Sequence, residues 1–279
     1  MQSRLYAMLP DAAVQWEKRK IQAGAMLLNA ISEQQKESIR EYFGLMFNQR
    51  RPMTFEGGVA TIHVHDFLSS GVTFVEKCLG ATDYGDLAAE IRVAKSSPDV
   101  KAVLLDVDSG GGSAVGCVEI GKMVSELALE KETALFTNGM CCSAAYCVGV
   151  GAARRYASPS AMVGSIGTIL TFFDFEELLT RNGISAHIIT SEGADLKASG
   201  NQYRKPTDEE IEHLQGLADE YAEQFTSHVW DNNAKIDAEE GFRGQAVSGR
   251  QAVNMGFVDG IATRDEVLAG LKAWATFDS

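Results

Sequence analysis

The chain has 279 residues, of which 45% are hydrophobic, so it is long and apolar enough to bury a full core and is not disordered. Its formal net charge of −13 argues against a nucleic-acid-binding protein, because binding phosphates requires a basic face that the sequence lacks. Five cysteines, an odd number without CxxC spacing, argue against a disulfide framework and a structural zinc site.

The N-terminal part of the sequence predicts a helical arm. Residues from about Asp11 to Phe47 are rich in Ala, Leu, Gln, Glu and Lys, which favours one or two helices ending before "NQRRP". We expect an arm over residues 1–55 and a second domain over residues 56–279. Composition leaves open whether the arm packs on the core or serves assembly. There is no signal-peptide pattern and no run of about 18 uncharged apolar residues, so we expect a cytoplasmic protein without a membrane span.

The sequence of the second domain predicts an α/β fold. Short β-rich runs alternate with amphipathic helical segments, an order typical of a largely parallel sheet. The expected strands are residues 58–64, 102–107, 133–137 and 186–190, and the expected helices are 84–94, 114–127 and 175–182.

A long helix is predicted after "KPTDEE". Thr207 as the N-cap and Glu210 three residues later form a capping-box signature. The apolar stripe of this helix, which we expect in the core or an interface, consists of Ile211, Leu214, Ala218, Tyr221, Phe225 and Val229. Residues 244–261 then predict a turn, a short helix and a last strand.

A glycine turn follows the strand over residues 102–107. Ser109 is followed by Gly110, Gly111 and Gly112, which let the backbone approach a ligand closely and direct N–H groups toward an anion. The turn has neither the GxxxxGK[ST] nor the GxGxxG pattern. A phosphate cradle and an oxyanion hole for acyl transfer both remain open.

Ser143 stands at the start of an Ala/Gly-rich segment, "NGMCCSAAYCVGVGAARRY". It is either a small packing residue or a nucleophile at a helix N-terminus, and the segment alone favours packing. Cys142 is a weaker alternative, because a nucleophilic cysteine needs a partner that lowers its pKa and the sequence identifies none.

Two lysines and the five histidines are the other side chains that we considered as a base, a metal ligand or a triad member. Lys197 and Lys205 lie in a glycine-containing loop, and a lysine serves as a base only where desolvation lowers its pKa. Most single lysines are surface residues. The histidines, which are His63, His65, His187, His213 and His228, have no metal-ligand or triad-like context and are best interpreted as structural.

Five motifs occur in a characteristic order: D-S-x-G-G, M-x-x-S-A-A-Y, V-G-S-I-G-T, G-A-x-x-K-x-x-G-N-x-Y, and G-x-A-V followed by G-x-V-D. With this order the chain resembles the serine peptidase family of bacterial signal peptide peptidase A and phage head-maturation (prohead) proteases, over roughly residues 57–263. The phage branch is more similar, through "SAAY" and "SGNQY" and the lack of a membrane anchor.

The resemblance implies a ClpP/crotonase-like fold of repeated β-β-α units, self-association and peptide hydrolysis by a Ser–Lys dyad. Ser143 matches the nucleophile and Lys197 the general base. Gly111 and Ala144 match the oxyanion donors. No metal or organic cofactor is implied.

The resemblance also implies which residues line the substrate groove: Gly112, Gly164, Ser165, Ile166 and Gly167.

The sequence departs from the family pattern in three ways. Glycine replaces the usual proline at position 110, which frees the turn. Cysteines replace small residues at 141 and 142, which raises thiol sensitivity. The lysine motif is one residue longer, so Lys205 is the fallback base.

We therefore expect a serine endopeptidase of the phage head-maturation type, cleaving scaffold or capsid proteins, or itself. It is expected to be a homo-oligomer in the host cytoplasm, inside a forming head if viral, with no nucleic-acid partner. The alternatives are a bacterial signal-peptide-peptidase-like protease, a crotonase-fold acyl-CoA enzyme, and a non-enzymatic capsid assembly factor.

Overall fold

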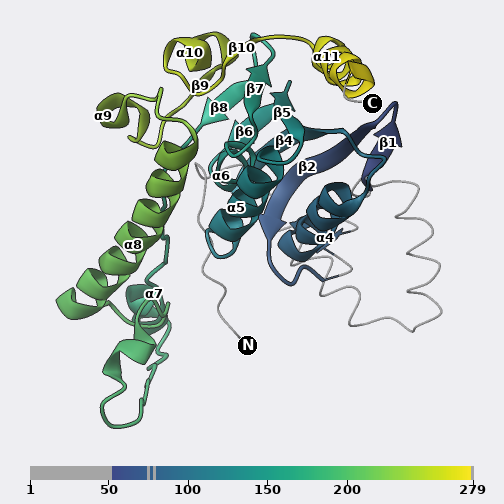
Figure 1. The fold of residues 1–279 in the computed structure, drawn as a ribbon. Coiled ribbons are helices and arrows are strands. Elements are labelled where there is room, and N and C mark those ends of the chain that lie inside the picture. The colour runs from purple at the N-terminus through teal and green to yellow at the C-terminus, as the bar shows by residue number, and fades with distance from the viewer. Residues whose placement is uncertain (1–51, 74–75, 78–79, 278–279) are drawn as a thin grey trace, which may run out of the picture.

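The computed structural model describes residues 52–73, 76–77 and 80–277, which form a mixed α/β fold (Figure 1). Its strands are β1 (Thr54–Glu56), β2 (Val59–Ser69), β3 (Thr82–Asp83), β4 (Ala102–Gly112), β5 (Glu132–Thr137), β6 (Met140–Cys142), β7 (Arg154–Ala157), β8 (Met162–Gly164), β9 (Ala246–Ser248) and β10 (Gly260–Ile261). Its helices are α4 (Tyr84–Ser96), α5 (Cys117–Ala128), α6 (Ala144–Gly149), α7 (Glu176–Arg181), the 3-10 helix η1 (Asp195–Ala198), α8 (Asp208–Asn232), α9 (Ala238–Gly241), α10 (Gly249–Asn254) and α11 (Arg264–Phe277).

The sheet is largely parallel, with the strand order β10-β7-β5-β4-β6-β8-β9 and with β2 also pairing with β4. The antiparallel pairs are β1 with β2 and β8 with β9. Strand β4 joins two parts of the sheet: residues 102–106 pair with β5, whereas Ser109 pairs with Cys141 of β6. The expected α/β class with a largely parallel sheet is confirmed, and the order β5-β6-α6 followed by β7-β8-α7 agrees with the expected repeated β-β-α units.

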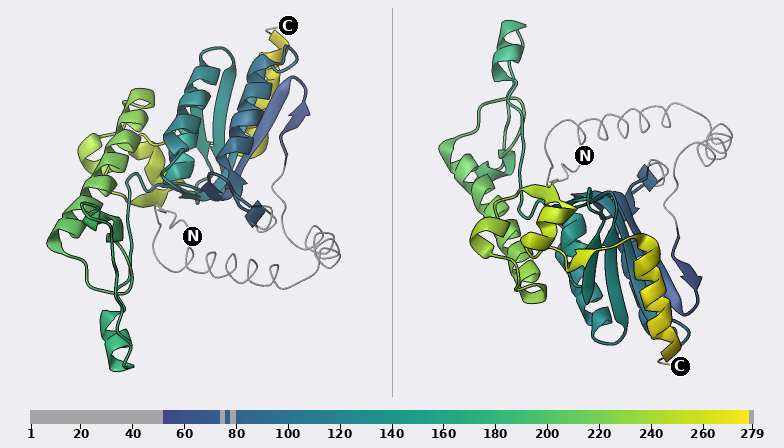
Figure 2. Two further views of the ribbon diagram at one scale, coloured as in Figure 1. Left: turned by 90° about the horizontal axis from the view of Figure 1, so that it is seen from below. Right: turned by 90° about the horizontal axis from the view of Figure 1, so that it is seen from above.

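Apolar side chains cover both faces of the central strands, as is usual for buried parallel strands. In β4, Val103, Leu105 and Val107 belong to the core cluster shared with α4, α5 and α6. Ala102 and Leu104 belong to the cluster shared with α11. Helix α11 accordingly lies on the opposite side of the sheet from α4 and α5 (Figure 2).

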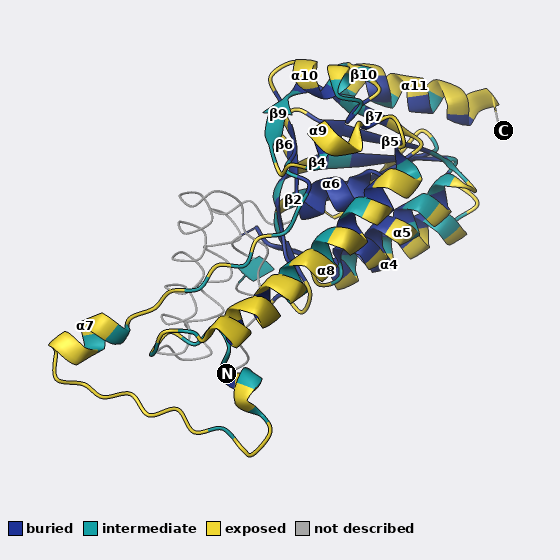
Figure 3. Cartoon of the chain, turned by 90° about the vertical axis from the view of Figure 1, so that its left-hand side faces the viewer, coloured by how far each residue is buried: buried dark blue, intermediate teal, exposed yellow. Residues whose placement is uncertain are grey.

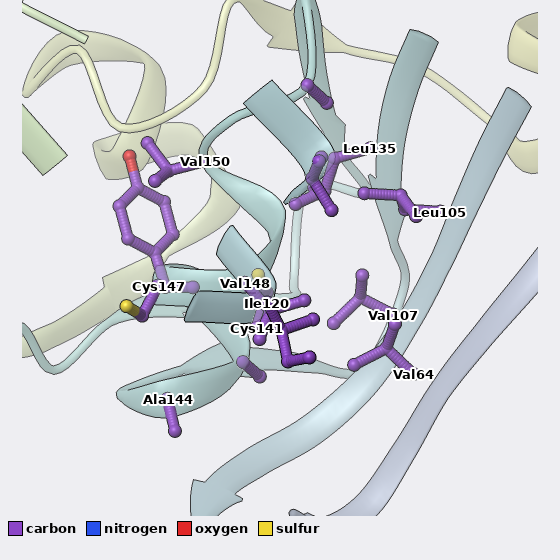
Figure 4. Close-up of a cluster of buried hydrophobic side chains, with 14 of the residues drawn as sticks. Val64, Leu105, Val107, Ile120, Leu135, Cys141, Ala144, Cys147, Val148 and Val150 are labelled. Carbon is purple, nitrogen blue, oxygen red and sulfur yellow. The ribbon is translucent and has the colours of Figure 1, made fainter. Parts of the chain in front are cut away.

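Helix α6 lies inside the larger core cluster. Ala144, Cys147 and Val148 lie among side chains of β2, β4 and α5 (Figure 4). Tyr146 is fully buried, and its hydroxyl donates a hydrogen bond of 2.8 Å to the carbonyl oxygen of Phe257. Hydrophobic burial therefore fixes the position of this short helix and of the residue that precedes it.

The segment between β8 and α8 leaves the sheet and is largely exposed (Figure 3). The prediction of a strand over residues 186–190 is wrong. The structure has no strand there, and Ile189 is 92% exposed. A strand needs a neighbour for its backbone hydrogen bonds, and none of the described strands pairs with this segment. A run of β-branched residues does not reveal whether such a neighbour exists.

The capping box of α8 is confirmed, because Thr207 Oγ1 accepts a hydrogen bond from the Glu210 N–H and the Glu210 carboxylate accepts one from the Thr207 N–H. The predicted apolar stripe is only partly core. Leu214, Phe225 and Val229 are buried, whereas Ile211 is 48% exposed. The first turns of α8 extend beyond the sheet together with the segment before them (Figure 3).

The predicted N-terminal arm lies outside the described residues except for residues 52–55. Of these, Thr54 and Phe55 belong to β1 and pair with β2. Within the described part of the chain, no helix has both the length and the apolar character needed to cross a membrane.

Replacing Tyr146 by Phe tests how firmly α6 is held. The variant leaves the buried carbonyl of Phe257 without this donor, so we expect the free energy of unfolding to fall by about 1–3 kcal/mol in urea denaturation. Tyr203→Phe is the matched control, because Tyr203 is 48% exposed and its loss should be near neutral. Equal effects for the two variants would contradict the anchoring role.

Candidate active site

Ser143 has a strained backbone directly before α6, with φ 52° and ψ −127°. Its N–H donates to the carbonyl of Gly164 at 2.8 Å, and its carbonyl accepts from the Cys147 N–H at 3.0 Å. Such a conformation costs a non-glycine residue about 1–3 kcal/mol and persists only where the surroundings impose it. The side chain is mostly buried, at 8% exposure.

Backbone strain gathers around this serine. Among the described residues, the non-glycine residues with positive φ are Asp66, Ser143 and Ser165. The carbonyl of Asp66 accepts a hydrogen bond from Ser109 in the glycine turn, and Ser165 directly follows the residue that accepts from Ser143. Strained residues cluster at functional sites, so these positions indicate one.

The glycine turn lies against Ser143. Gly111 has φ +107°, and a Cβ atom added there would lie 2.7 Å from Ser143 Cβ and 3.1 Å from the Ala144 nitrogen. Only glycine fits this approach. The structure therefore brings Gly111 against Ser143 and Ala144, from which it is separated by more than thirty residues in the sequence.

The two expected N–H donors differ in their present partners. Ala144 is the first residue of α6, so its N–H has no acceptor within the helix. The Gly111 N–H donates to Ser109 Oγ at 3.0 Å. Gly111 can serve a substrate only after the Ser109 hydroxyl turns away.

Two of the residues expected to line the groove lie in the core. Ile166 is fully buried, and a Cβ on Gly112 would meet the Leu68 carbonyl oxygen at 2.0 Å. These positions therefore pack the fold and present no side chain to a substrate. Ser165 and Gly167 are partly exposed, and Gly164 is buried and supports Ser143.

Lys197 does not lie with this group in the structure. It is exposed on η1, in the segment that extends away from the sheet (Figure 3). No hydrogen bond or ion pair described for the chain joins it to Ser143. Lys205 belongs to the same segment, and its backbone N–H donates to Glu176 at 2.9 Å.

Cys142 is a poor nucleophile in this environment. Burial raises the pKa of its thiol to about 11, so the thiolate is scarce at neutral pH. Burial also raises the pKa of Cys141 well above its ordinary value. Both side chains are buried, which protects them from solvent reagents.

His228 supports α6, and no hydrogen bond or ion pair described for the chain joins it to Ser143. Its Nε2 lies 3.1 Å from the carbonyl oxygen of Cys147, and burial lowers its pKa. His187 and His213 are exposed. The structural interpretation of these histidines agrees with their positions.

The strain at Ser143 predicts a stability difference between two variants. Glycine tolerates positive φ and alanine does not. We therefore expect Ser143→Gly to be more stable than Ser143→Ala, with a free energy of unfolding higher by about 1 kcal/mol or more. Urea denaturation measures both. At Ser96, which is exposed in α4, the same pair should give the opposite order, because alanine favours a helix. The same order at both positions would rule out strain at Ser143.

Comparison with known proteins gives two informative relatives. The chain is 26% identical to the capsid assembly protease C of Escherichia phage lambda over 232 residues, which cover 80% of this chain and 51% of that protein. It is 28% identical to protease 4 of Salmonella typhi over 240 residues, covering 82% of this chain and 37% of that protein. The chain thus spans about half, or less, of the length of these relatives.

A solved structure of a membrane-bound stomatin-specific protease has a TM-score of 0.45 and 12% identity, over 76% of this chain and 83% of that chain. The sequence profile of peptidase family S49 matches residues 127–277, more than half of the chain. This range includes Ser143 and Lys197 and begins after the glycine turn. The chain therefore belongs to peptidase family S49.

Proposed function

We propose that the protein is a serine endopeptidase in which Ser143 is the nucleophile. The observation that carries this proposal is the strained backbone of Ser143 against Gly111, at the start of a helix fixed in the core. A structural serine has no need of this conformation, and neither does the serine of a crotonase-type acyl-CoA enzyme. Membership of peptidase family S49 supports the same chemistry.

In the proposed reaction, Ser143 Oγ attacks the carbonyl carbon of a peptide bond while its proton passes to the neutral amine of Lys197. The negative charge on the carbonyl oxygen is held by the Ala144 N–H, and by the Gly111 N–H once Ser109 releases it. The lysine then gives the proton to the leaving amine. Water, activated by the same lysine, hydrolyses the acyl-enzyme and restores the serine.

The position of Lys197 means that the site must be completed by a rearrangement or by another copy of the chain. The segment that carries it exposes many large apolar side chains, including Ile169, Phe173, Phe175, Leu178, Ile184 and Ile189. An exposed apolar surface of this kind indicates an interaction site. We infer that the segment is covered in a homo-oligomer, and that it then contributes Lys197 to a serine.

For the substrate, we favour a protein of a forming phage head, either scaffold or capsid. Support comes from the name of the phage lambda relative, a capsid assembly protease. A signal-peptide-peptidase-like role is the alternative. Incubation with a purified scaffold or capsid protein, followed by mass analysis of the fragments, distinguishes the two.

A fluorophosphonate probe tests the nucleophile and the base. Intact mass should show one adduct on the wild type, none on Ser143→Ala, and much slower labelling of Lys197→Ala. Lys205→Ala is the matched control from the same exposed segment and should label like the wild type. If Lys205→Ala loses labelling instead, Lys205 is the base. An unlabelled wild type that is folded and oligomeric would refute the peptidase proposal.

Mixing two inactive variants tests where the lysine comes from. If another copy supplies Lys197, a refolded mixture of Ser143→Ala and Lys197→Ala should regain part of the labelling, because some sites then combine an intact serine with an intact lysine. If the lysine acts within its own chain, each mixed assembly stays inactive. The separately refolded variants are the controls.

Gly111→Ala should remove labelling of Ser143. The added methyl group meets Ser143 and is strained at positive φ, so we expect the rate to fall by about a hundredfold or more. Gly216→Ala is the control, because a Cβ there meets nothing within 4 Å on a helix. Normal labelling of folded Gly111→Ala would show that the turn is not part of the site.

A further inference from the structure

A second group of polar side chains lies on the sheet, on the face that α11 partly covers. His63 and His65 are two residues apart on β2 and so point to the same face. The register of β2 and β4 places Asp106 opposite His63. Up to Leu104, the same face of β4 packs against α11. The three polar side chains begin where that apolar contact ends.

The geometry of this group suits a tetrahedral metal ion. Ligand atoms from His63, His65 and Asp106 all lie within 4.8 Å of one another. His63 Nδ1 lies 3.3 Å from Asp106 Oδ2. Ligands bound to zinc at about 2.0–2.1 Å in a tetrahedron lie about 3.3 Å apart, so this pair already has the separation of two zinc ligands.

His63 is the ligand whose position most needs an explanation. Its side chain is 4% exposed, and its Nδ1 has no hydrogen-bond partner of good geometry although it faces the carboxylate. A buried nitrogen that faces a carboxylate without a well-aligned hydrogen bond is costly. A cation shared by the nitrogen and the carboxylate would satisfy both.

A neighbouring side chain already orients the Asp106 carboxylate. Arg264 Nε donates to Asp106 Oδ2 at 3.0 Å, so the carboxylate is oriented by a partner at the start of α11. Carboxylates that bind metals are usually hydrogen-bonded from outside in this way.

We propose that His63, His65 and Asp106 bind a divalent transition-metal ion of the zinc class. Two imidazoles and one carboxylate are ligands that zinc prefers, and three protein ligands leave a fourth position for water. The ion would link β2 to β4 and, through Arg264, to α11. It would thereby stabilise the strand pair that leads into Asp66 and the glycine turn.

Cobalt(II) and zinc test the site without reference to peptidase activity. The full chain, without a histidine tag, should retain one equivalent of zinc after dialysis and show the visible absorption of tetrahedral cobalt when cobalt is added instead. His65→Gln should weaken zinc binding by at least about tenfold. His65 is one of the two partly buried ligands, so this variant is expected to fold. His187→Gln, at an exposed histidine far along the chain, should bind like the wild type.

Thermal unfolding gives an independent readout. Zinc should raise the Tm of the wild type and of His187→Gln, and leave the Tm of His65→Gln unchanged. The proposal is overturned if the wild type binds no zinc and no tetrahedral cobalt, since His63, Asp106 and Arg264 are then only an ion-pair network. It is also overturned if folded His65→Gln binds as tightly as the wild type, since the ion then lies elsewhere.

Discussion

The close approach of Gly111 to Ser143 is the constraint on which the candidate active site depends. The end of β4 can lie against the start of α6 only because position 111 carries no side chain and adopts positive φ. Ser143 is then held in its strained conformation from both sides, by the Gly164 carbonyl and by the first turn of α6. Strain of this kind needs a rigid support, and the buried Tyr146 with its bond to Phe257 supplies it.

Strand β4 connects the two sites described for this chain. Its first half pairs with β5 and is packed on both faces, Asp106 lies in its middle, and Ser109 pairs with the neighbouring part of the sheet. A ligand on Asp106 would therefore act on the same strand whose end forms the glycine turn. The proposed base differs in its position, since Lys197 belongs to an exposed segment outside the core. If Ser143 and Lys197 act together as proposed, the activity depends on how that segment is docked.

Local patterns in the sequence were sufficient for much of the fold. The expected strands at β2, β4 and β5 and the helices α4, α5 and α8 are present, because alternation, apolar periodicity and a capping box are short-range signals. The short strands β6, β7 and β8 are not predicted from the sequence, since three or four residues carry too little periodicity. The strand expected over residues 186–190 is absent, because pairing depends on a neighbour that no local pattern reveals.

The sequence by itself determined the α/β class, the family resemblance and the choice of Ser143 as the candidate nucleophile, because the motif order and the glycine turn are linear features. Only the tertiary structure decided which residues meet. It placed Gly111 beside Ser143 and Ala144, buried Ile166 in the core, and left Lys197 on an outlying segment. It also set Asp106 against two histidines that looked unrelated to it. Strand register and helix packing join positions that are distant along the chain, and neither is encoded in any short stretch of residues.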